Sequence, residues 1–166
     1  MDDGQDDWER QIDEVWATAG DRSEDDVLAA ISELAGQRPA EDPAAMYERA
    51  SVLDFVGREA EAQPLYARAL SAGLDARRHP RAVIQLASTL RNLGRAGEGL
   101  TMLEEEMATG VHEDGLDDAL AAFLALALVD EGRPVEAAAR ALTALAGHLP
   151  EYGRAVQHYA GELLEP

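Results

Sequence analysis

The side chains with the greatest chemical potential in this sequence are four histidines and several runs of acids. The histidines are His79, His112, His148 and His158. No two of them have the spacing that places two metal ligands on one helix, so we interpret them as surface residues and expect no metal site. The triplet Glu104-Glu105-Glu106 could supply acid–base groups, but such a run outside a cleft is typical of a solvated helix face.

Other catalytic patterns are missing from the sequence. There is no cysteine, which excludes a disulfide framework, a thiolate metal site and a cysteine nucleophile. The sequence contains neither a phosphate-binding glycine loop nor a Gly-x-Ser-x-Gly nucleophile motif. We therefore expect a protein that is not an enzyme and that needs no cofactor.

Charge and hydropathy narrow the class of partner. The chain has 33 acids, 14 arginines and no lysine, for a net charge of -19, which argues against nucleic acid as a partner. The longest apolar run, Ala119 to Val129, is about half of what a membrane-spanning helix needs, and Met1 is followed by acids rather than a signal peptide. We expect a cytoplasmic protein, and the arginine-only, alanine-rich composition suggests a bacterial source.

One stretch reverses the acidic character of the chain. Between Ala76 and Gly97 there is no acid, and the stretch contains five arginines: Arg77, Arg78, Arg81, Arg91 and Arg95. At helical spacing, one stripe contains Arg81, Gln85, Ser88 and Asn92, with Ile84, Arg91 and Arg95 beside it. Two interpretations stay open. The arginines either offset neighbouring acids, or they form a basic face for a carboxylate or an acidic peptide.

Glycines at a regular spacing show how the chain is organised. The first series is separated by 37, 37 and 38 residues and comprises Gly20, Gly57, Gly94 and Gly132. The second is separated by 37 residues each time and comprises Gly36, Gly73, Gly110 and Gly147. A fixed period of about 20–50 residues is typical of a solenoid or repeat array.

The segments between these glycines have helical periodicity. From Pro80 to Leu93 the apolar residues recur every three or four positions. Each unit therefore reads as a helix, a turn at the first glycine, a second helix and a stop at the second, because glycine readily adopts left-handed backbone. Prolines are expected at the first helical turn, and we place Pro43, Pro80, Pro134 and Pro150 there. Ser23 followed by Asp26 resembles a helix cap.

Three segments resemble the turn between the two helices of a tetratricopeptide repeat. They are Gly57-Arg58-Glu59-Ala60-Glu61-Ala62, Gly94-Arg95-Ala96-Gly97-Glu98-Gly99 and Gly132-Arg133-Pro134-Val135-Glu136-Ala137. The family's pattern of small residues and one aromatic at the helix crossing is matched by Ala50, Ala62, Tyr66 and Ala69. Later units keep Ala87 and Ala125 but depart from the pattern at Gly99, Glu106 and Ala141. The stretch from Ile84 to Arg95 is similar to a bacterial subgroup whose repeat has about 37 residues.

The resemblance implies an all-α fold, a right-handed superhelical array of antiparallel helix hairpins. We expect a single domain over residues 1–166, with repeats at about 5–36, 37–73, 74–110 and 111–147 and a capping helix at 150–164. The first repeat is degenerate, because Asp13 stands where a small residue is expected, and we predict that its first helix docks loosely. In the capping helix the docking stripe is Tyr152, Val156, Tyr159 and Leu163.

The resemblance also implies a concave groove that binds a peptide or protein segment. The residues that it places there are Tyr47, Ser51, Asp54, Phe55, Arg81, Ile84, Ser88, Arg91, Asn92, Leu126 and Val129, with Ala122 alongside. The expected ligand is an unknown protein or an acidic peptide. The alternative is a self-assembling homodimer, for which the stripe of Trp8, Ile12 and Trp16 would supply the contact.

Overall fold

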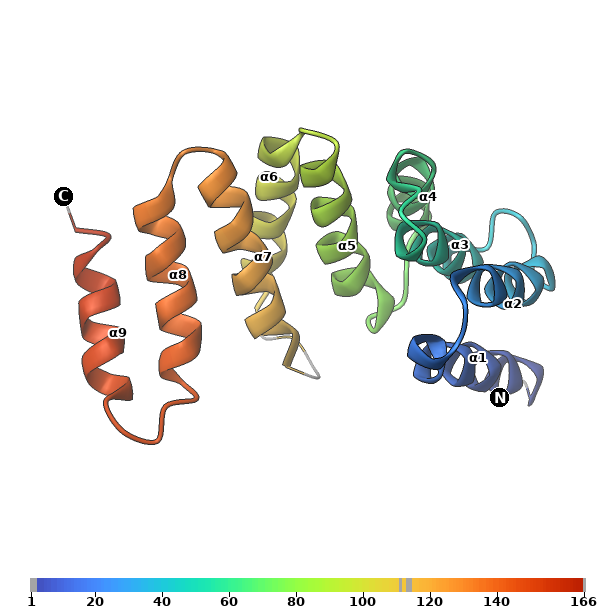
Figure 1. Ribbon diagram of the computed structural model, residues 1–166, viewed down its shortest axis with the longest axis horizontal. Helices are drawn as coiled ribbons and strands as arrows, with labels where there is room; N and C mark the ends of the chain where they lie inside the picture. The colour runs from blue at the N-terminus through green and yellow to red at the C-terminus, as the bar shows by residue number, and fades with distance from the viewer. Residues whose placement is uncertain (1–2, 111, 113–114, 166) are drawn as a thin grey trace. The chain divides into compact units, whose positions relative to one another are not determined.

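The computed structural model describes residues 3–110, 112 and 115–165, and these residues contain helices and no strand (Figure 1). The elements are α1 (Asp3–Ala17), η1 (Ala19–Asp21), α2 (Glu24–Gly36), α3 (Pro43–Phe55), α4 (Glu59–Ala72), α5 (Arg78–Asn92), α6 (Ala96–Met107), α7 (Leu116–Asp130), α8 (Pro134–Ala146) and α9 (Gly153–Glu162). Consecutive helices pack against each other, which confirms the all-α array of helix hairpins. In the described part of the chain, every helix is too short or too polar to cross a membrane.

The chain forms two compact units, Met1–Ala82 and Val83–Pro166, and their boundary falls inside α5. In the first unit α1 packs on α2, α2 on α3 and α3 on α4. In the second unit α6 packs on α7, α7 on α8 and α8 on α9. The single domain and the right-handed superhelix stay predictions.

The predicted turns occur within the hairpins. Gly57, Gly94 and Gly132 have φ of +73°, +76° and +73°, which favours glycine because a Cβ would be strained. At each turn the following arginine N–H donates to a carbonyl oxygen of the preceding helix over 2.8 Å. The second series also marks helix ends, because α2 ends at Gly36 and Gly147 is the C-cap of α8, but these two glycines lack the left-handed backbone that was expected there.

Three helix starts follow the predicted residues. The Ser23 side chain accepts from the Asp26 N–H, and Pro43 and Pro134 open α3 and α8. Pro80 also lies in a first turn, as its third residue, because α5 starts at Arg78, whose N–H donates to the Asp75 carboxylate. The position of Pro150 was wrong, since α9 starts after it, at Gly153.

The crossings of paired helices are filled by small residues. Ala50, Ala62 and Ala69 are fully buried, as is Tyr66. Gly99, which departs from the family pattern, lies against α5 so closely that a Cβ would come within 2.9 Å of the Ala87 carbonyl oxygen. Glycine at this position therefore allows α5 and α6 to approach closely.

The expectation that α1 docks loosely was wrong. Trp8, Ile12 and Val15 are buried in a core with α2 and α3, and the Trp8 indole N–H donates to the Leu34 carbonyl oxygen over 2.9 Å. Asp13 does not face this core but is exposed, because the buried stripe lies on the other side of α1. Trp8 and Ile12 are only 4% and 1% exposed, so these two residues offer little surface for a dimer contact, whereas Trp16 is half-buried; the homodimer stays a prediction.

The predicted docking stripe of the last helix was only partly right. In α9, Val156 is half-buried and Ala160 is buried, whereas Tyr152 and Tyr159 are 78% and 62% exposed. Tyr152 precedes the helix as its N-cap, in left-handed backbone with φ of +66°, and so does not belong to the helical stripe. The side of α9 that faces α8 is thus centred on Ala160.

Replacing Leu90 by Ala should lower the free energy of unfolding by about 2–5 kcal/mol, because its side chain is 2% exposed and truncation leaves a cavity. The Leu86 side chain is 3% exposed, so replacing it by Ala should lower the free energy of unfolding by a similar amount. The measurement is urea unfolding followed by far-ultraviolet circular dichroism. Leu93→Ala is the matched control, since Leu93 is 39% exposed, and it should change stability by less than about 1 kcal/mol. Equal losses at Leu90 and Leu93 would contradict the packing described.

Candidate functional site

The groove residues assigned to α3 divide into buried and exposed side chains. Tyr47 and Ser51 are buried, at 7% and 6% exposure. The Tyr47 ring lies 6.1 Å from that of Tyr66, and burial together with the charge of Glu48 raises the pKa of Tyr47 to about 12. Asp54 is half-buried. Of the four predicted residues of α3, Phe55 therefore offers the largest apolar surface, at 43% exposure.

An aromatic pair supports Phe55. Its ring meets the edge of Trp16 at a centroid distance of 5.9 Å and an interplanar angle of 76°. The Trp16 indole N–H donates to Glu48 Oε2 over 2.8 Å, which fixes the indole ring. Phe55 is thus held on the first unit by α1 as well as by its own helix.

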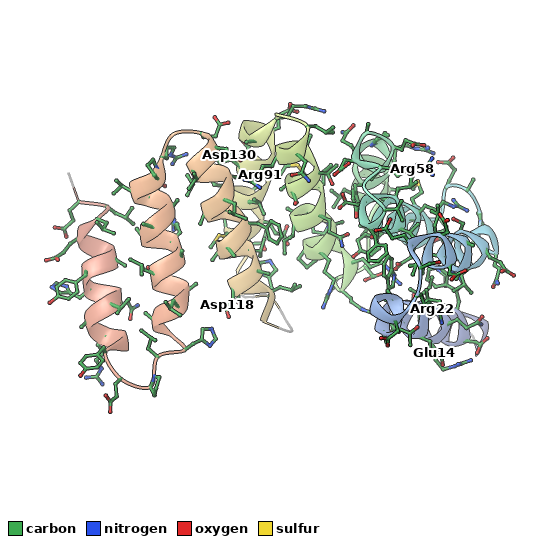
Figure 2. All side chains as sticks on the ribbon, viewed as in Figure 1. Glu14, Arg22, Arg58, Arg91, Asp118 and Asp130 are labelled. Atoms are coloured by element: carbon green, nitrogen blue, oxygen red, sulfur yellow. The ribbon has the colours of Figure 1, made fainter. Side chains whose placement is uncertain are left out.

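The groove residues assigned to α5 are mostly half-buried. Arg81 and Ser88 are half-buried, Asn92 is exposed, and Ile84 is buried at 6% exposure. Arg91 forms an ion pair with Asp130 at the end of α7, and Figure 2 labels both residues. The structure therefore brings the ends of α5 and α7 together in the second unit.

The groove residues assigned to α7 form an exposed apolar stripe. Leu126 is 44% exposed and Val129 is 52% exposed, and Ala122 is exposed one turn before them. The apolar character of α7 is clearest at the position that corresponds among the three helices. Six residues before the turn glycine, α3 and α5 have Ser51 and Ser88, whereas α7 has Leu126. The α7 stripe is thus the part of the predicted site with the most exposed apolar side chains.

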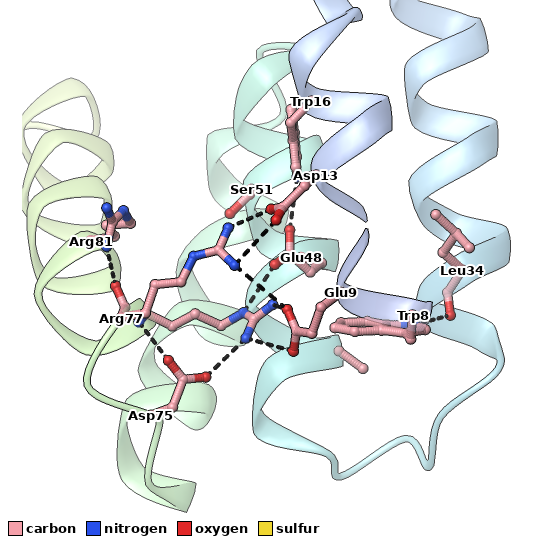
Figure 3. Close-up of polar contacts among 12 residues, drawn as sticks. Trp8, Glu9, Asp13, Trp16, Leu34, Glu48, Ser51, Asp75, Arg77 and Arg81 are labelled. Carbon is pink, nitrogen blue, oxygen red and sulfur yellow. Dashed lines mark hydrogen bonds and ion pairs between the residues drawn. The ribbon is translucent and has the colours of Figure 1, made fainter. Parts of the chain in front are cut away.

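A buried arginine network lies next to the predicted site in the first unit (Figure 3). The Arg78 guanidinium is 5% exposed. Its Nε donates to Glu48 Oε1 over 3.1 Å, and its terminal nitrogens donate to Glu9 and Asp75. The network joins α1, α3 and the start of α5, and a Trp8 ring centroid lies 5.5 Å from the guanidinium carbon.

Burial and ion pairing compete within this network. Burial opposes the charge of Arg78, but Glu9, Asp75 and Glu48 outweigh it and raise the pKa of the guanidinium. Burial also raises the pKa of the Glu48 carboxyl, while the Trp16 N–H and Arg78 act in the opposite direction. Both Glu48 oxygens accept hydrogen bonds, one from each donor, so the ion pair has the hydrogen bonding that a buried charge needs.

The acid-free stretch is neutralised by acids from elsewhere in the sequence. Arg77 pairs with Asp13, Arg91 with Asp130 and Arg95 with Glu98, while Arg81 donates to the Arg77 carbonyl oxygen. Together with the Arg78 network, these contacts support the interpretation that the arginines offset neighbouring acids. A carboxylate ligand at Arg77, Arg91 or Arg95 would have to displace a carboxylate of the chain itself.

Sequence reasoning missed Glu48 and Arg78. They lie 30 residues apart, and Arg78 and Glu9 lie 69 apart, so no local pattern relates them. The only signal was the contrast between the acidic N-terminal segment and the acid-free stretch. Among the described residues, no group of three or more His, Asp or Glu side chains is arranged to hold a metal ion.

Replacing Arg78 by Ala should lower the free energy of unfolding by about 3–5 kcal/mol, because Glu48 would remain buried without its cation. Both tryptophans, Trp8 and Trp16, lie in the first unit, so urea unfolding followed by tryptophan fluorescence reports on that unit. Arg10→Ala is the matched control, since it removes an exposed arginine of the same unit and should have little effect. The role of the network would be refuted by an Arg78 variant as stable as the Arg10 variant.

The comparisons with known proteins agree with the geometry. None of the curated proteins and none of the solved structures that were searched gives a significant match. The profile of the family described as Tetratrico peptide repeat matches residues 43–163, which cover α3 to α9. Repeats of this family generally mediate protein–protein interaction and are non-catalytic. The chain belongs to the tetratricopeptide repeat family.

Proposed function

We propose that this chain is a non-catalytic scaffold that binds a peptide or protein segment along the first helices of its hairpins, with the α7 stripe as the main contact. The observation that carries the proposal is the exposure of Leu126 and Val129 on successive turns of one helix. Burying such side chains against a ligand is favourable because it removes apolar surface from water. Phe55 provides a comparable apolar surface on the first unit.

The polar neighbours of the stripe determine which ligands fit. Arg91 and Asp130 neutralise each other, so the end of α7 presents no excess of either charge at this pair. A ligand with apolar side chains is therefore favoured over the acidic peptide expected from the sequence, which remains the alternative ligand. A bacterial source and a cytoplasmic location stay predictions from the sequence.

Changing Leu126 and Val129 together to Ser should weaken binding of a peptide selected from a random display library against the full chain by at least about tenfold, since about 1.4 kcal/mol of lost burial has that effect. The measurement is the dissociation constant by fluorescence anisotropy of the labelled peptide. Val135→Ser is the matched control, because Val135 on α8 is 56% exposed but lies outside the stripe.

Two results would redirect the proposal. Equal weakening by the Val135 variant would contradict the α7 stripe as the main contact, because the loss would not be specific to α7. Unaltered affinity in the α7 variant, together with a steep loss of affinity as salt is raised, would favour an acidic peptide held by Arg81 and Arg91.

A further inference from the structure

A histidine joins the end of α6 to the start of α7 in the second unit. The His112 side chain is 8% exposed, although its place near a turn suggested a surface residue. Its Nδ1 lies 2.7 Å from Asp117 Oδ1, and its Nε2 lies 3.0 Å from Glu106 Oε1. The His112 backbone N–H also donates to the Asp117 carboxylate over 3.2 Å. One side chain thus contacts carboxylates of two consecutive helices.

The partners of the ring decide its protonation state. A neutral imidazole has one N–H donor and one lone pair, whereas the charged ring donates from both nitrogens. Each nitrogen of His112 faces a carboxylate oxygen, which can only accept. Thr109 Oγ1 also lies 3.3 Å from Nε2, but this hydroxyl donates to the Glu106 carbonyl oxygen and so offers the ring a lone pair. With both carboxyl groups ionised, this geometry is satisfied only by the imidazolium, which donates from both nitrogens.

The burial of Glu106 strengthens the need for a charged His112 ring. This glutamate is 6% exposed and occupies a position where the repeat pattern has a small residue. A buried carboxylate that faced the lone pair of a neutral ring would have lost the cation that compensates it. The stability of the contact therefore depends on a proton that histidine gains or loses near neutral pH.

We propose that protonated His112 is a pH-sensitive tie that fastens the first turn of α7 to the last turn of α6, and that the tie loosens as the pH rises above neutrality. In the described part of the chain, the charged groups that face the ring are Glu106 from α6 and Asp117 from α7. The N-cap residue of α7 is Gly115, which has no side chain to cap the helix, so the contact between Asp117 and His112 supports its first turn.

The direction of the pH dependence follows from the two carboxylates. The hydrogen bond with Asp117 raises the pKa of His112, burial opposes it, and Glu106 raises it further. The stabilisation is therefore complete below about pH 6.5, the ordinary value of histidine, and is lost as the pH rises through the raised folded-state pKa. The same bond lowers the pKa of Asp117, so this part of the stabilisation is lost in acid instead.

A second histidine supplies the matched control. His148 Nε2 lies 2.7 Å from Asp118 Oδ2, in the same first turn of α7, but the His148 side chain is 66% exposed. Solvent can hydrate this pair in either protonation state, so it contributes little. The two histidines thus differ mainly in burial.

The test uses the full chain and no ligand, so its result does not depend on the proposed binding function. NMR titration of the imidazole resonances should show His112 losing its proton above the ordinary histidine range. Hydrogen exchange of the Leu120 to Phe123 amides, which donate to the carbonyl oxygens of the first turn of α7, should show a loss of protection between about pH 6.5 and 9 after correction for intrinsic rates. This loss should be absent in His112→Gln, whose neutral amide does not titrate, and present in His148→Gln.

Two outcomes would overturn the proposal. One is a His112 resonance that titrates at or below the ordinary value of histidine, which the wild-type chain alone can reveal even if the His112 variant does not fold. The other is a pH-dependent loss of protection that persists in a folded His112→Gln chain, because the dependence would then arise from another group.

Discussion

The buried guanidinium of Arg78 is the interaction on which the first unit depends. A cation removed from water is stable only when hydrogen-bonded anions replace the lost hydration. Glu9, Glu48 and Asp75 provide these anions from α1, α3 and the segment before α5. Their positions fix how α1 approaches the rest of the unit, and the contacts of Trp8 and Ile12 add the apolar burial. The most acidic helix thus docks beside the most basic stretch.

The same kind of pairing extends to Arg77, Arg91 and Arg95 of the acid-free stretch. The chain has 33 acids and 14 arginines, and the arginines of the acid-free stretch are engaged with the chain's own carboxylates and carbonyl oxygens. A ligand that relied on these cations would have to compete with groups held at high local concentration by the fold. Exposed apolar side chains such as Leu126 face no such competition, which is why recognition by α7 is the better supported hypothesis.

Local signals made much of the fold predictable. Left-handed backbone is a local property, so the regular spacing of Gly57, Gly94 and Gly132 located the turns. The docking of α1 was not predictable in this way, because helical periodicity shows which residues share a stripe but not which stripe faces the core. Asp13 was assigned to the contact by its place in the repeat, whereas the larger side chains on the stripe of Trp8 occupy it. Of the predicted site, the burial of Tyr47 and Ser51 likewise depends on a neighbouring helix.

The departures from the repeat pattern come with partners that no single repeat encodes. Gly99 admits the Ala87 backbone, and Glu106 faces His112. The buried Glu48, which is not such a departure, likewise faces a distant cation, Arg78. The identity of the cation then determines how each of the two buried ion pairs, Glu48 with Arg78 and Glu106 with His112, responds to pH. Arginine stays charged at every pH that a folded protein experiences, so the Arg78 network is not switched by loss of the proton from its cation. Histidine loses its charge near neutrality, so the junction of α6 and α7 is the one of these two ties whose cation responds to mild alkalinity. Both ties bury a glutamate, but the choice of cation makes one permanent and the other conditional.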